Sequence, residues 1–380
     1  MSNLDTLTIR VRVPNVTSGI MQLTSGKLGT GKLGDNPLRW VSIKCETVSV
    51  DIARGATDGA SSGPEVGTAT LVASGLDLAS LPGLRPSMAL SLTVNEEPIY
   101  RGSILDFLID GTTLTIVAVD RVSDLQQSPR DPVISWMEWE GYTQTNGEPW
   151  DARLTRLLAD TGIPYQPAYQ WRQPPGQALM ASLTQIRSIA EALDLAAASI
   201  DGRWWVDRTG TVKLGVLPDE PGNPLVLADD HSITGHVCYV DVVDSWDTRD
   251  LVNIVTIENT EATPRGDADT QTRRTFRDVT SVATYGPRSR TVSTCLYTRD
   301  QFAPSVGNLA AQLLARASRP RRRVRSVTVD GATAPQTAID LHTPIDVIRS
   351  GRRHRLLIVG LTHTITPTEW KTEIHTTERP

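Results

Sequence analysis

The sequence predicts a mainly β protein with an α+β insert, in which two antiparallel β-barrels flank a small α+β domain. Three observations lead to this fold class: strand-like segments in the first third, two helical segments and a hairpin in the middle third, and a return to strands in the last third. The predicted units are an N-terminal arm or loop at 1–37, a first barrel at 38–130, an α+β domain at 131–225 and a second barrel with one packed helix at 226–380.

Five short segments define the first barrel. In VSIKCETVSVDIARG, Val48, Val50 and Ile52 alternate with polar residues, as in a strand with one buried face. Four further segments are bounded by turn residues: GTATLVASG, MALSLTV, PIYRGSILDFLID and TTLTIVAVD. Together they predict a barrel or sandwich over residues 38–126. The Gly-rich TSGKLGTGKLGDNP before them predicts a flexible arm or loop.

The middle third predicts two helices and a hairpin. EPWDARLTRLLADTGIPY spaces Leu154, Leu157 and Leu158 along one helical face, and Gly162 and Pro164 then end the helix. LTQIRSIAEALDLAAASIDG has the same helical spacing of apolar residues and is followed by a glycine at its end. Its apolar face consists of Leu183, Ile186, Ile189, Ala190 and Leu193. GRWWVDRTGTVKLGVL follows as two strands joined by a tight turn.

The last third predicts strands and one helix. DLVNIVTIEN, RSVTVDG, TPIDVIRSG and the final segment HRLLIVGLTHTITPTEWKTEIHTT have strand character, whereas EATPRGDADTQTRR is predicted as a polar loop. PSVGNLAAQLLARASRP places Leu309, Leu313 and Leu314 on the apolar side of a helix that ends at Pro320.

The two histidines of the final segment raise the question of a metal or acid–base site. If residues 367–368 form a two-residue turn, His363 lies opposite Thr372 and shares the packed face with Trp370, while His375 lies on the other face. The two histidines then cannot share a metal ion. We therefore expect the hairpin that closes a barrel.

Composition excludes several classes of protein. The 380-residue chain has a formal net charge of −5, which argues against a dedicated nucleic-acid binder. Its three cysteines, Cys45, Cys238 and Cys295, are far apart, which argues against a disulfide framework or a structural zinc site. The N-terminus lacks an apolar signal region and no apolar run is long enough to cross a bilayer, so we expect synthesis in a cytoplasm.

No motif predicts a catalytic, metal or cofactor site. GKLGTGK begins like a phosphate-binding loop, but Lys32 is followed by Leu33 and no helix can start there, so a mobile loop is expected. Four aspartates recur every three residues without the glycine of an EF-hand, and a solvated turn is favoured over a bound cation. They are Asp241, Asp244, Asp247 and Asp250. GxSxG, SxxK and HExxH are absent, so the chain is predicted not to be an enzyme and to need no cofactor.

Two residue groups raise the question of a binding surface. A basic run predicts a positively charged patch at an interface or in a lumen, and nucleic-acid contact is the more specific alternative. The run consists of Arg319, Arg321, Arg322, Arg323 and Arg325. The tryptophans of the middle third suit core or interface positions better than a sugar-stacking platform. They are Trp136, Trp139, Trp150, Trp171, Trp204 and Trp205.

Several segments, in their order along the chain, resemble the minor tail proteins and tail-tip hubs of long-tailed bacteriophages. In the first barrel the matching positions are Arg54, Gly55, Gly67, Thr68, Arg101 and Gly102. The turn at Arg85 and Pro86 departs from the pattern at Ser87, where the family often has Gly. The segment IAEALDLAAASIDGRWWVDRTGTVKL is similar to the family's middle domain. In the second barrel the matching positions are Asn253, Tyr285, Gly286 and Trp370.

This resemblance implies a structural virion protein related to type VI secretion spike hubs. Each subunit would carry two barrels of the tail-tube type, and a homotrimer would form a ring of six barrels that caps the tail tube. Its implied partners are the distal tail protein ring, the tape measure protein and receptor-binding elements, with DNA crossing the lumen transiently. The implied location is the virion tail tip. A C-terminal lytic domain, which some members of the family carry, is not expected in this chain. The alternatives are a host-surface carbohydrate-binding tail protein and, with no motif to support it, an enzyme acting on wall polymers.

Overall fold

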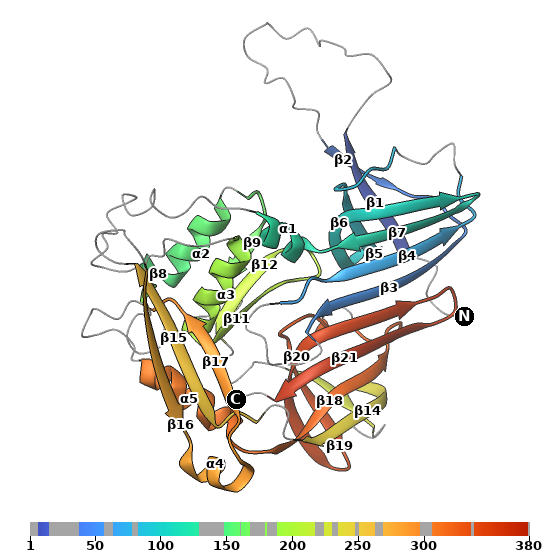
Figure 1. Cartoon of the computed structure of the whole chain (residues 1–380). Helices are drawn as coiled ribbons and strands as arrows, with labels where there is room; N and C mark the ends of the chain where they lie inside the picture. The colour runs from blue at the N-terminus through green and yellow to red at the C-terminus, as the bar shows by residue number, and fades with distance from the viewer. Residues whose placement is uncertain are drawn as a thin grey trace, which may run out of the picture.

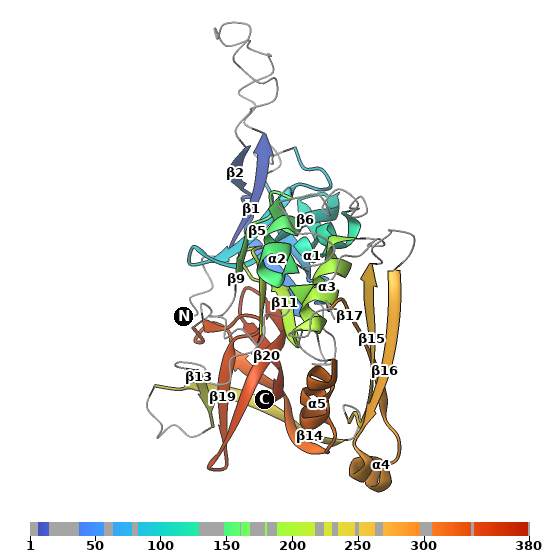
Figure 2. The ribbon, with the colours of Figure 1, turned by 90° about the vertical axis from the view of Figure 1, so that its left-hand side faces the viewer.

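The computed structural model shows a mainly β chain in which two β units and an α+β unit lie side by side (Figures 1 and 2). No helix among the described residues has the length and hydropathy of a membrane span. The structure describes residues 7–14, 38–56, 64–77, 83–128, 148–159, 161–167, 179–180, 188–216, 224–229, 235–247, 251–262, 269–296, 306–335 and 338–378.

The first β unit is a rolled antiparallel sheet with the strand order β3-β4-β7-β6-β5-β1-β2. Its strands are β1 (Leu7–Pro14), β2 (Leu38–Ser42), β3 (Thr47–Gly55), β4 (Thr68–Ser74), β5 (Ala89–Val94), β6 (Glu97–Asp110) and β7 (Thr113–Val119). The sequence placed residues 1–37 in an arm or loop, but residues 7–14 of that range form β1, which pairs with β5 and β2. Its LTIRVRV pattern alternates apolar and polar residues, which is the period of a strand.

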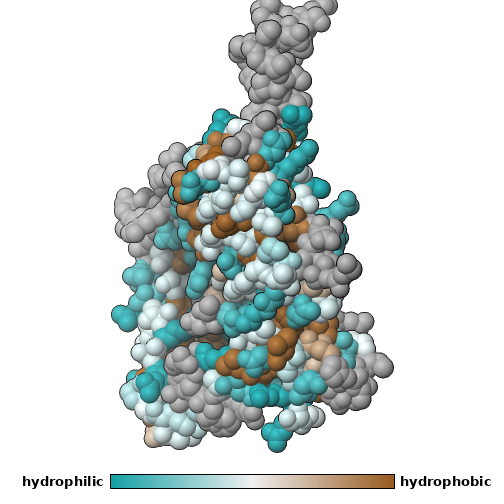
Figure 3. All heavy atoms as spheres, turned by 90° about the vertical axis from the view of Figure 1, so that its right-hand side faces the viewer, coloured by the Kyte–Doolittle hydropathy of each residue, from teal (hydrophilic) through white to brown (hydrophobic). Residues whose placement is uncertain are grey.

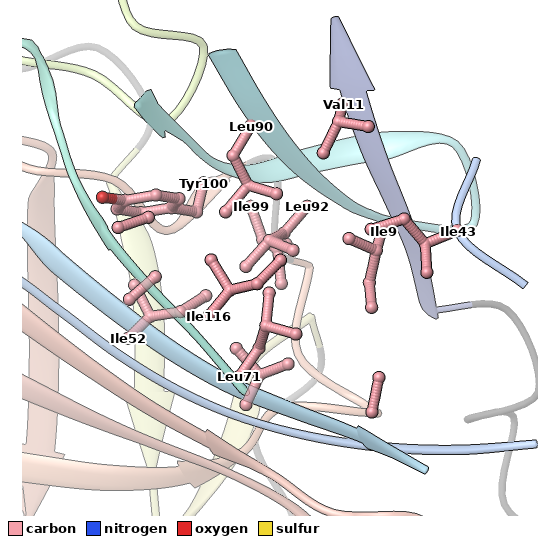
Figure 4. Close-up of a cluster of buried hydrophobic side chains, with 14 of the residues drawn as sticks. Ile9, Val11, Ile43, Ile52, Leu71, Leu90, Leu92, Ile99, Tyr100 and Ile116 are labelled. Atoms are coloured by element: carbon pink, nitrogen blue, oxygen red, sulfur yellow. The ribbon is translucent and has the colours of Figure 1, made fainter. Parts of the chain in front are cut away.

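Alternate side chains of these strands fill one core. Leu114, Ile116 and Ala118 of β7 are fully buried, while the residues between them are half-buried on the outer face. The buried side chains of several strands point toward one another around Tyr100 (Figure 4). Each fully buried leucine or isoleucine stabilises the fold by about 1.5–3 kcal/mol. This core therefore accounts for the alternation that the sequence shows.

The second β unit is a closed six-stranded barrel with the order β19-β13-β14-β18-β21-β20, closed by pairing of β20 with β19. Its strands are β13 (Leu225–Ala228), β14 (Val237–Asp247), β18 (Arg321–Asp330), β19 (Pro344–Arg349), β20 (Arg352–Ile365) and β21 (Trp370–Glu378). β13 runs parallel to both neighbours, and the other pairs are antiparallel. The aspartate-rich segment predicted as a turn contributes Asp241, Asp244 and Asp247 to β14 instead, because its intervening valines and tryptophan suit a strand.

The closing hairpin has the predicted register. His363 pairs with Thr372, Ile365 with Trp370, and the Thr366 nitrogen donates to the Glu369 carbonyl at 2.8 Å. His363 and Trp370 are buried, whereas His375 is half-buried on the other face. The predicted register and the predicted placement of the two histidines on opposite faces of the hairpin are confirmed.

One strand belongs to both β units. The first half of β20 pairs with β19, and its second half, residues 360–365, pairs with residues 50–55 of β3. A bulge between Ile358 and Gly360 separates the two halves. Two glycines allow the close approach at this point: a Cβ on Gly55 would lie 2.3 Å from the Val359 carbonyl oxygen, and a Cβ on Gly360 would lie 2.3 Å from the Ala56 carbonyl oxygen.

The α+β unit packs three helices and a hairpin around its own core. Its elements are α1 (Arg121–Gln127), β8 (Glu148–Pro149), α2 (Trp150–Ala159), β9 (Tyr165–Pro167), β10 (Leu179–Met180), α3 (Ile189–Ser199), β11 (Gly202–Val206) and β12 (Val212–Val216). Leu157 and Leu158 are buried as predicted, as are Ile189, Ala190 and Leu193. Leu183 and Ile186 lie outside the described residues.

A separate three-stranded sheet with the order β16-β15-β17 flanks the α+β unit. Its elements are β15 (Ile254–Ala262), β16 (Asp269–Arg277), α4 (Val279–Tyr285), β17 (Ser289–Thr294) and α5 (Val306–Ala317). Leu309 of α5 is buried against this sheet, with Leu313 and Leu314 partly buried beside it. The segment predicted as a polar loop instead supplies the end of β15 and most of β16, since an exposed strand tolerates polar residues on both faces.

We predict that Gly55→Ala lowers the free energy of unfolding by about 2–5 kcal/mol, measured by urea denaturation. The positive φ of +72° costs an alanine about 1–2 kcal/mol, and the overlap with β20 adds about 1–3 kcal/mol. Gly351→Ala is the matched control, because Gly351 has φ +74° and a Cβ added there would meet no atom within 4 Å. Equal losses in the two variants would contradict the close packing of β3 on β20.

Candidate functional site: the junction between the β units

Arg54 connects three parts of the chain. It follows Val50 and Ile52 on the inner face of β3 and is 3% exposed. Its guanidinium donates to the Val206 carbonyl of β11 at 2.9 Å and to Asp340 Oδ1 at 2.8 Å. Val206 belongs to the α+β unit and Asp340 to the loop before β19, so one side chain joins all three units.

The carboxylate of Asp340 has three donors around it. Besides Arg54, it accepts hydrogen bonds from the backbone nitrogens of Leu341 and Arg208, at 2.8 and 3.1 Å. An ion pair whose arginine is buried offsets its desolvation only when further hydrogen bonds support it, and these two backbone donors do so. Removal of either partner should therefore be strongly unfavourable.

Glycines make room for a buried polar cluster beside Arg54. The Tyr100 hydroxyl donates to the Gly67 carbonyl at 3.3 Å, and a Cβ on Gly102 would lie 2.7 Å from that hydroxyl oxygen. A Cβ on Gly67 would lie 2.4 Å from Asp120 Oδ2. Asp120 caps α1 by accepting a hydrogen bond from the Val122 nitrogen at 3.0 Å. Burial raises the pKa of Asp120 to about 7, although Arg54 lowers it.

The structure brings together five of the ten positions that the sequence singled out. These are Arg54, Gly55, Gly67, Thr68 and Gly102. Arg101 is separated from them because it lies on the outer face, where its guanidinium stacks 5.1 Å from the centre of the Trp40 ring and reaches the Thr209 carbonyl at 3.5 Å. Burial and the neighbouring Arg12 lower the pKa of Arg101.

Asn253, Gly286 and Tyr285 form a second group at the end of the three-stranded sheet. Asn253 is fully buried; its Nδ2 donates to the Gly286 carbonyl at 2.8 Å and its Oδ1 accepts from the Arg288 nitrogen at 2.7 Å. Gly286 ends α4 at φ +73°, while Tyr285 is 40% exposed. Asn253 thus fixes the loop between α4 and β17.

Trp370 lies further along the junction, where β20 pairs with β3. Its indole nitrogen donates to His363 Nδ1 at 3.4 Å, and its ring occupies the space that the missing side chain of Gly331 leaves. Burial, together with the nearby positive charge of Arg54, lowers the pKa of His363 to about 3. His363 is therefore a neutral core residue that accepts a hydrogen bond.

The described arginines of the basic run differ in exposure. Arg319 is exposed after α5, whereas Arg325 is half-buried and donates from Nε to Ser245 Oγ of β14 at 2.6 Å. Arg323 is also half-buried on β18, and the side chains of Arg321 and Arg322 are not among those that the structure describes. A lumen or interface role for this run stays a prediction.

The described residues contain no metal-binding cluster and leave few tryptophan rings to consider as a sugar-binding surface. No group of three or more His, Cys, Asp or Glu side chains among them could hold a metal ion. Trp204 and Trp205 are buried, at 1% and 4% exposure, so neither presents a ring to a sugar. Trp136, Trp139 and Trp171 lie outside the described residues, as does the side chain of Trp150.

Comparison with solved structures gives the fold. The chain matches a 43 kDa tail protein of prophage MuSo2 from Shewanella oneidensis over 98% of both chains, at 12% identity and a TM-score of 0.58. It matches a tail protein from Neisseria meningitidis MC58 over 98% of this chain and 96% of that one, at 13% identity and a TM-score of 0.60.

The chain has the fold of phage tail proteins. A third similar structure is the prophage tail protein gp18 from Listeria monocytogenes EGD-e, with 91% of this chain and 93% of that chain covered, 11% identity and a TM-score of 0.50. Neither the protein-family models nor the curated proteins gave a match. The predicted mainly β class with an α+β insert is confirmed, and the resemblance to tail proteins agrees with this fold.

Sequence reasoning missed Asp340, Tyr100 and Asp120. Asp120 had a readable signal, because an Asp directly before a helical segment is a typical N-cap. Tyr100 stands beside the predicted Arg101 and Gly102, but nothing in the sequence gives its direction. Asp340 lies 286 residues from Arg54, and one sequence alone contains no pattern that links them.

We predict that Arg54→Met destabilises the chain by about 3–5 kcal/mol in urea denaturation, since it leaves the Asp340 carboxylate buried without its cation. In a double-mutant cycle with Asp340→Asn, the coupling should exceed about 1 kcal/mol. The control pair is Arg273 and Glu258, whose nitrogen and oxygen lie 3.4 Å apart with Arg273 67% exposed. Its coupling should stay within about 1 kcal/mol, and a similar value at Arg54 would refute the linking role.

We also predict that stability rises with pH between about 4 and 6.5. Burial lowers the pKa of both His342 and His363 from 6.5 to about 3, so the unfolded chain binds more protons in this window. Each histidine should contribute about 1.4 kcal/mol per pH unit. Asp120 has the opposite effect on the free energy of unfolding. Its pKa is raised from 3.8 to about 7, so in this window the folded chain keeps a proton on Asp120 that the unfolded chain has lost.

Urea denaturation at several pH values checks these signs. His363→Gln should flatten the rise, and Asp120→Asn should steepen it. The matched control for the substitution itself is His354→Gln, at a half-buried position of β20. A slope that His363→Gln does not alter would show that this imidazole is protonated in the folded chain.

Proposed function

We propose that this chain is a structural tail-tip or baseplate hub that caps a phage tail tube as a homotrimer. The observation that carries the proposal is the joining of a closed barrel and a second rolled sheet through the shared strand β20. Three copies would place six such units around one axis, which suits a six-fold tube. Closed cyclic symmetry is a common solution for assemblies of this kind.

The outer surfaces of both β units support contact with other proteins. Leu105 and Leu108 of β6 are 55% and 65% exposed, and Val240 and Val243 of β14 are 72% and 48% exposed. The face of the molecule in Figure 3 carries apolar side chains in separate areas between polar ones. Exposed apolar groups on strands are unfavourable in an isolated chain and favour burial in an assembly.

The proposed partners are the distal tail protein ring, the tape measure protein and receptor-binding elements. The proposed location is the virion tail tip, and the proposed role is architectural rather than enzymatic. Arg12 and Arg101 on the outer face of the first sheet, with Arg121 at the start of α1 beside them, would suit contact with DNA crossing the lumen or with an acidic partner surface.

We predict that native mass spectrometry of the assembled form gives about 124 kDa, three times the 41.4 kDa chain. Cross-linking of assembled tails followed by mass spectrometry should connect this chain to itself and to the tail-tube proteins. A strict monomer in solution and in assembled tails would contradict the trimer, and binding of the purified chain to host cell walls would instead favour the carbohydrate-binding alternative.

A further inference from the structure

A cavity of about 370 Å³ lies where the α+β unit meets the three-stranded sheet. One wall comes from α3 and β11, the other from β17, and Leu313 of α5 adds an apolar side. In Figure 1 these elements meet to the left of the paired strands β3 and β20. The site is therefore separate from the contacts described above.

Arg203 is the charged group with unused hydrogen-bonding capacity in this cavity. Its Nη1 donates to the Gly202 carbonyl at 2.9 Å, and it forms no ion pair with the described residues. Burial lowers the pKa of Arg203 to about 10; Asp201 acts against this effect, while Arg290 and Arg316 add to it. A guanidinium has five N–H donors, so most of those on Arg203 have no protein acceptor among the described residues.

Three acidic side chains line the cavity with Arg203, namely Glu191, Asp194 and Asp201, and the last two have protein partners. Asp201 forms an ion pair with Arg316. Asp194 Oδ1 accepts the indole N–H of Trp204 at 2.6 Å, and burial raises the pKa of this carboxyl. Arg203 thus keeps donors for a bound anion, and Arg290 on the opposite wall adds a second positive charge to the cavity.

The other wall is the edge of a sheet. β17 pairs in parallel with β15 on one side, and it is the last strand in the order β16-β15-β17. Four successive residues of β17, from Arg290 to Ser293, all line the cavity. Successive side chains of a strand point to opposite faces of the sheet, so a cavity over one face would contact only every second residue. The cavity must therefore run along the edge of β17, where an extended segment could add as a further strand.

We propose that this cavity binds a carboxylate group, held by the guanidinium of Arg203 with Arg290 on the facing wall. The carboxylate could come from an extended polypeptide that follows the edge of β17 and ends at Arg203, or from a small free acid. An arginine fork matches the two oxygens of a carboxylate, which favours this anion over a halide. The inference does not depend on the proposed function.

Isothermal titration calorimetry on the full chain tests the proposal with three probes: the N-acetylated tripeptide Thr-Val-Thr with a free C-terminus, the same peptide amidated, and sodium acetate. The free-acid peptide should bind at least about tenfold more tightly than the amide, because only it offers a charge-assisted pair to the arginines. Arg203→Gln should weaken the free-acid peptide by a similar factor, while Arg319→Gln, at an exposed arginine outside the cavity, should not.

The probes also distinguish the two sources. Much weaker binding of acetate than of the peptide supports an extended polypeptide, whereas equal binding supports a small acid at the same carboxylate site. Equal affinities of the free-acid and amidated peptides, or no binding of any probe at millimolar concentration, would overturn the proposal. The peptide comparison uses the unaltered chain, so the test stands even if Arg203→Gln fails to fold.

Discussion

The structure depends on the buried guanidinium of Arg54. A single side chain on β3 meets a carbonyl of the α+β unit and a carboxylate of the closed barrel, so the relative placement of three units is tied to one ion pair. An arginine suits this position because its fork donates to acceptors in different directions, and a lysine could not reproduce that geometry. The cost of removing this charge from water is offset by the three donors that surround Asp340.

Glycines permit this arrangement by their lack of a side chain. Gly55 and Gly360 let two backbones touch, and Gly67 and Gly102 leave space for the carboxyl of Asp120 and the hydroxyl of Tyr100. The polar groups are thus satisfied inside a tightly packed region, where an unpaired one would be costly. Four backbone positions without a Cβ are as much a part of the junction as the charged residues.

Sequence periodicity predicts the elements better than their partners. The alternation in β3 and β7 and the register of the final hairpin at His363 follow directly from a period of two, because local sequence decides which face is buried. The strand at residues 7–14 was missed because the Gly-rich segment after it dominated the interpretation of the N-terminus. β16 was missed because an exposed edge strand needs no apolar face.

The junction around Arg54 also shows that local sequence does not predict distant partners. Arg54, Gly55 and Gly102 could be singled out as a pattern, but their meeting point depends on Asp340, which is far away in the chain. Arg101 shares that pattern yet points outward, since it is one residue out of phase with Tyr100 on β6. Long-range pairing of this kind is decided by the whole fold and leaves no local trace in one sequence.

The pairing of β20 with strands of both β units limits how these units can move relative to each other. Residues 360–365 of β20 are hydrogen-bonded to β3 of the first unit on one side and to β21 of the second unit on the other, so a rotation of one unit against the other would have to break one of these two ladders. The two units therefore move as one rigid body. If such subunits form a ring, any widening of its opening must take place at the contacts between chains, with each chain turning as a solid body.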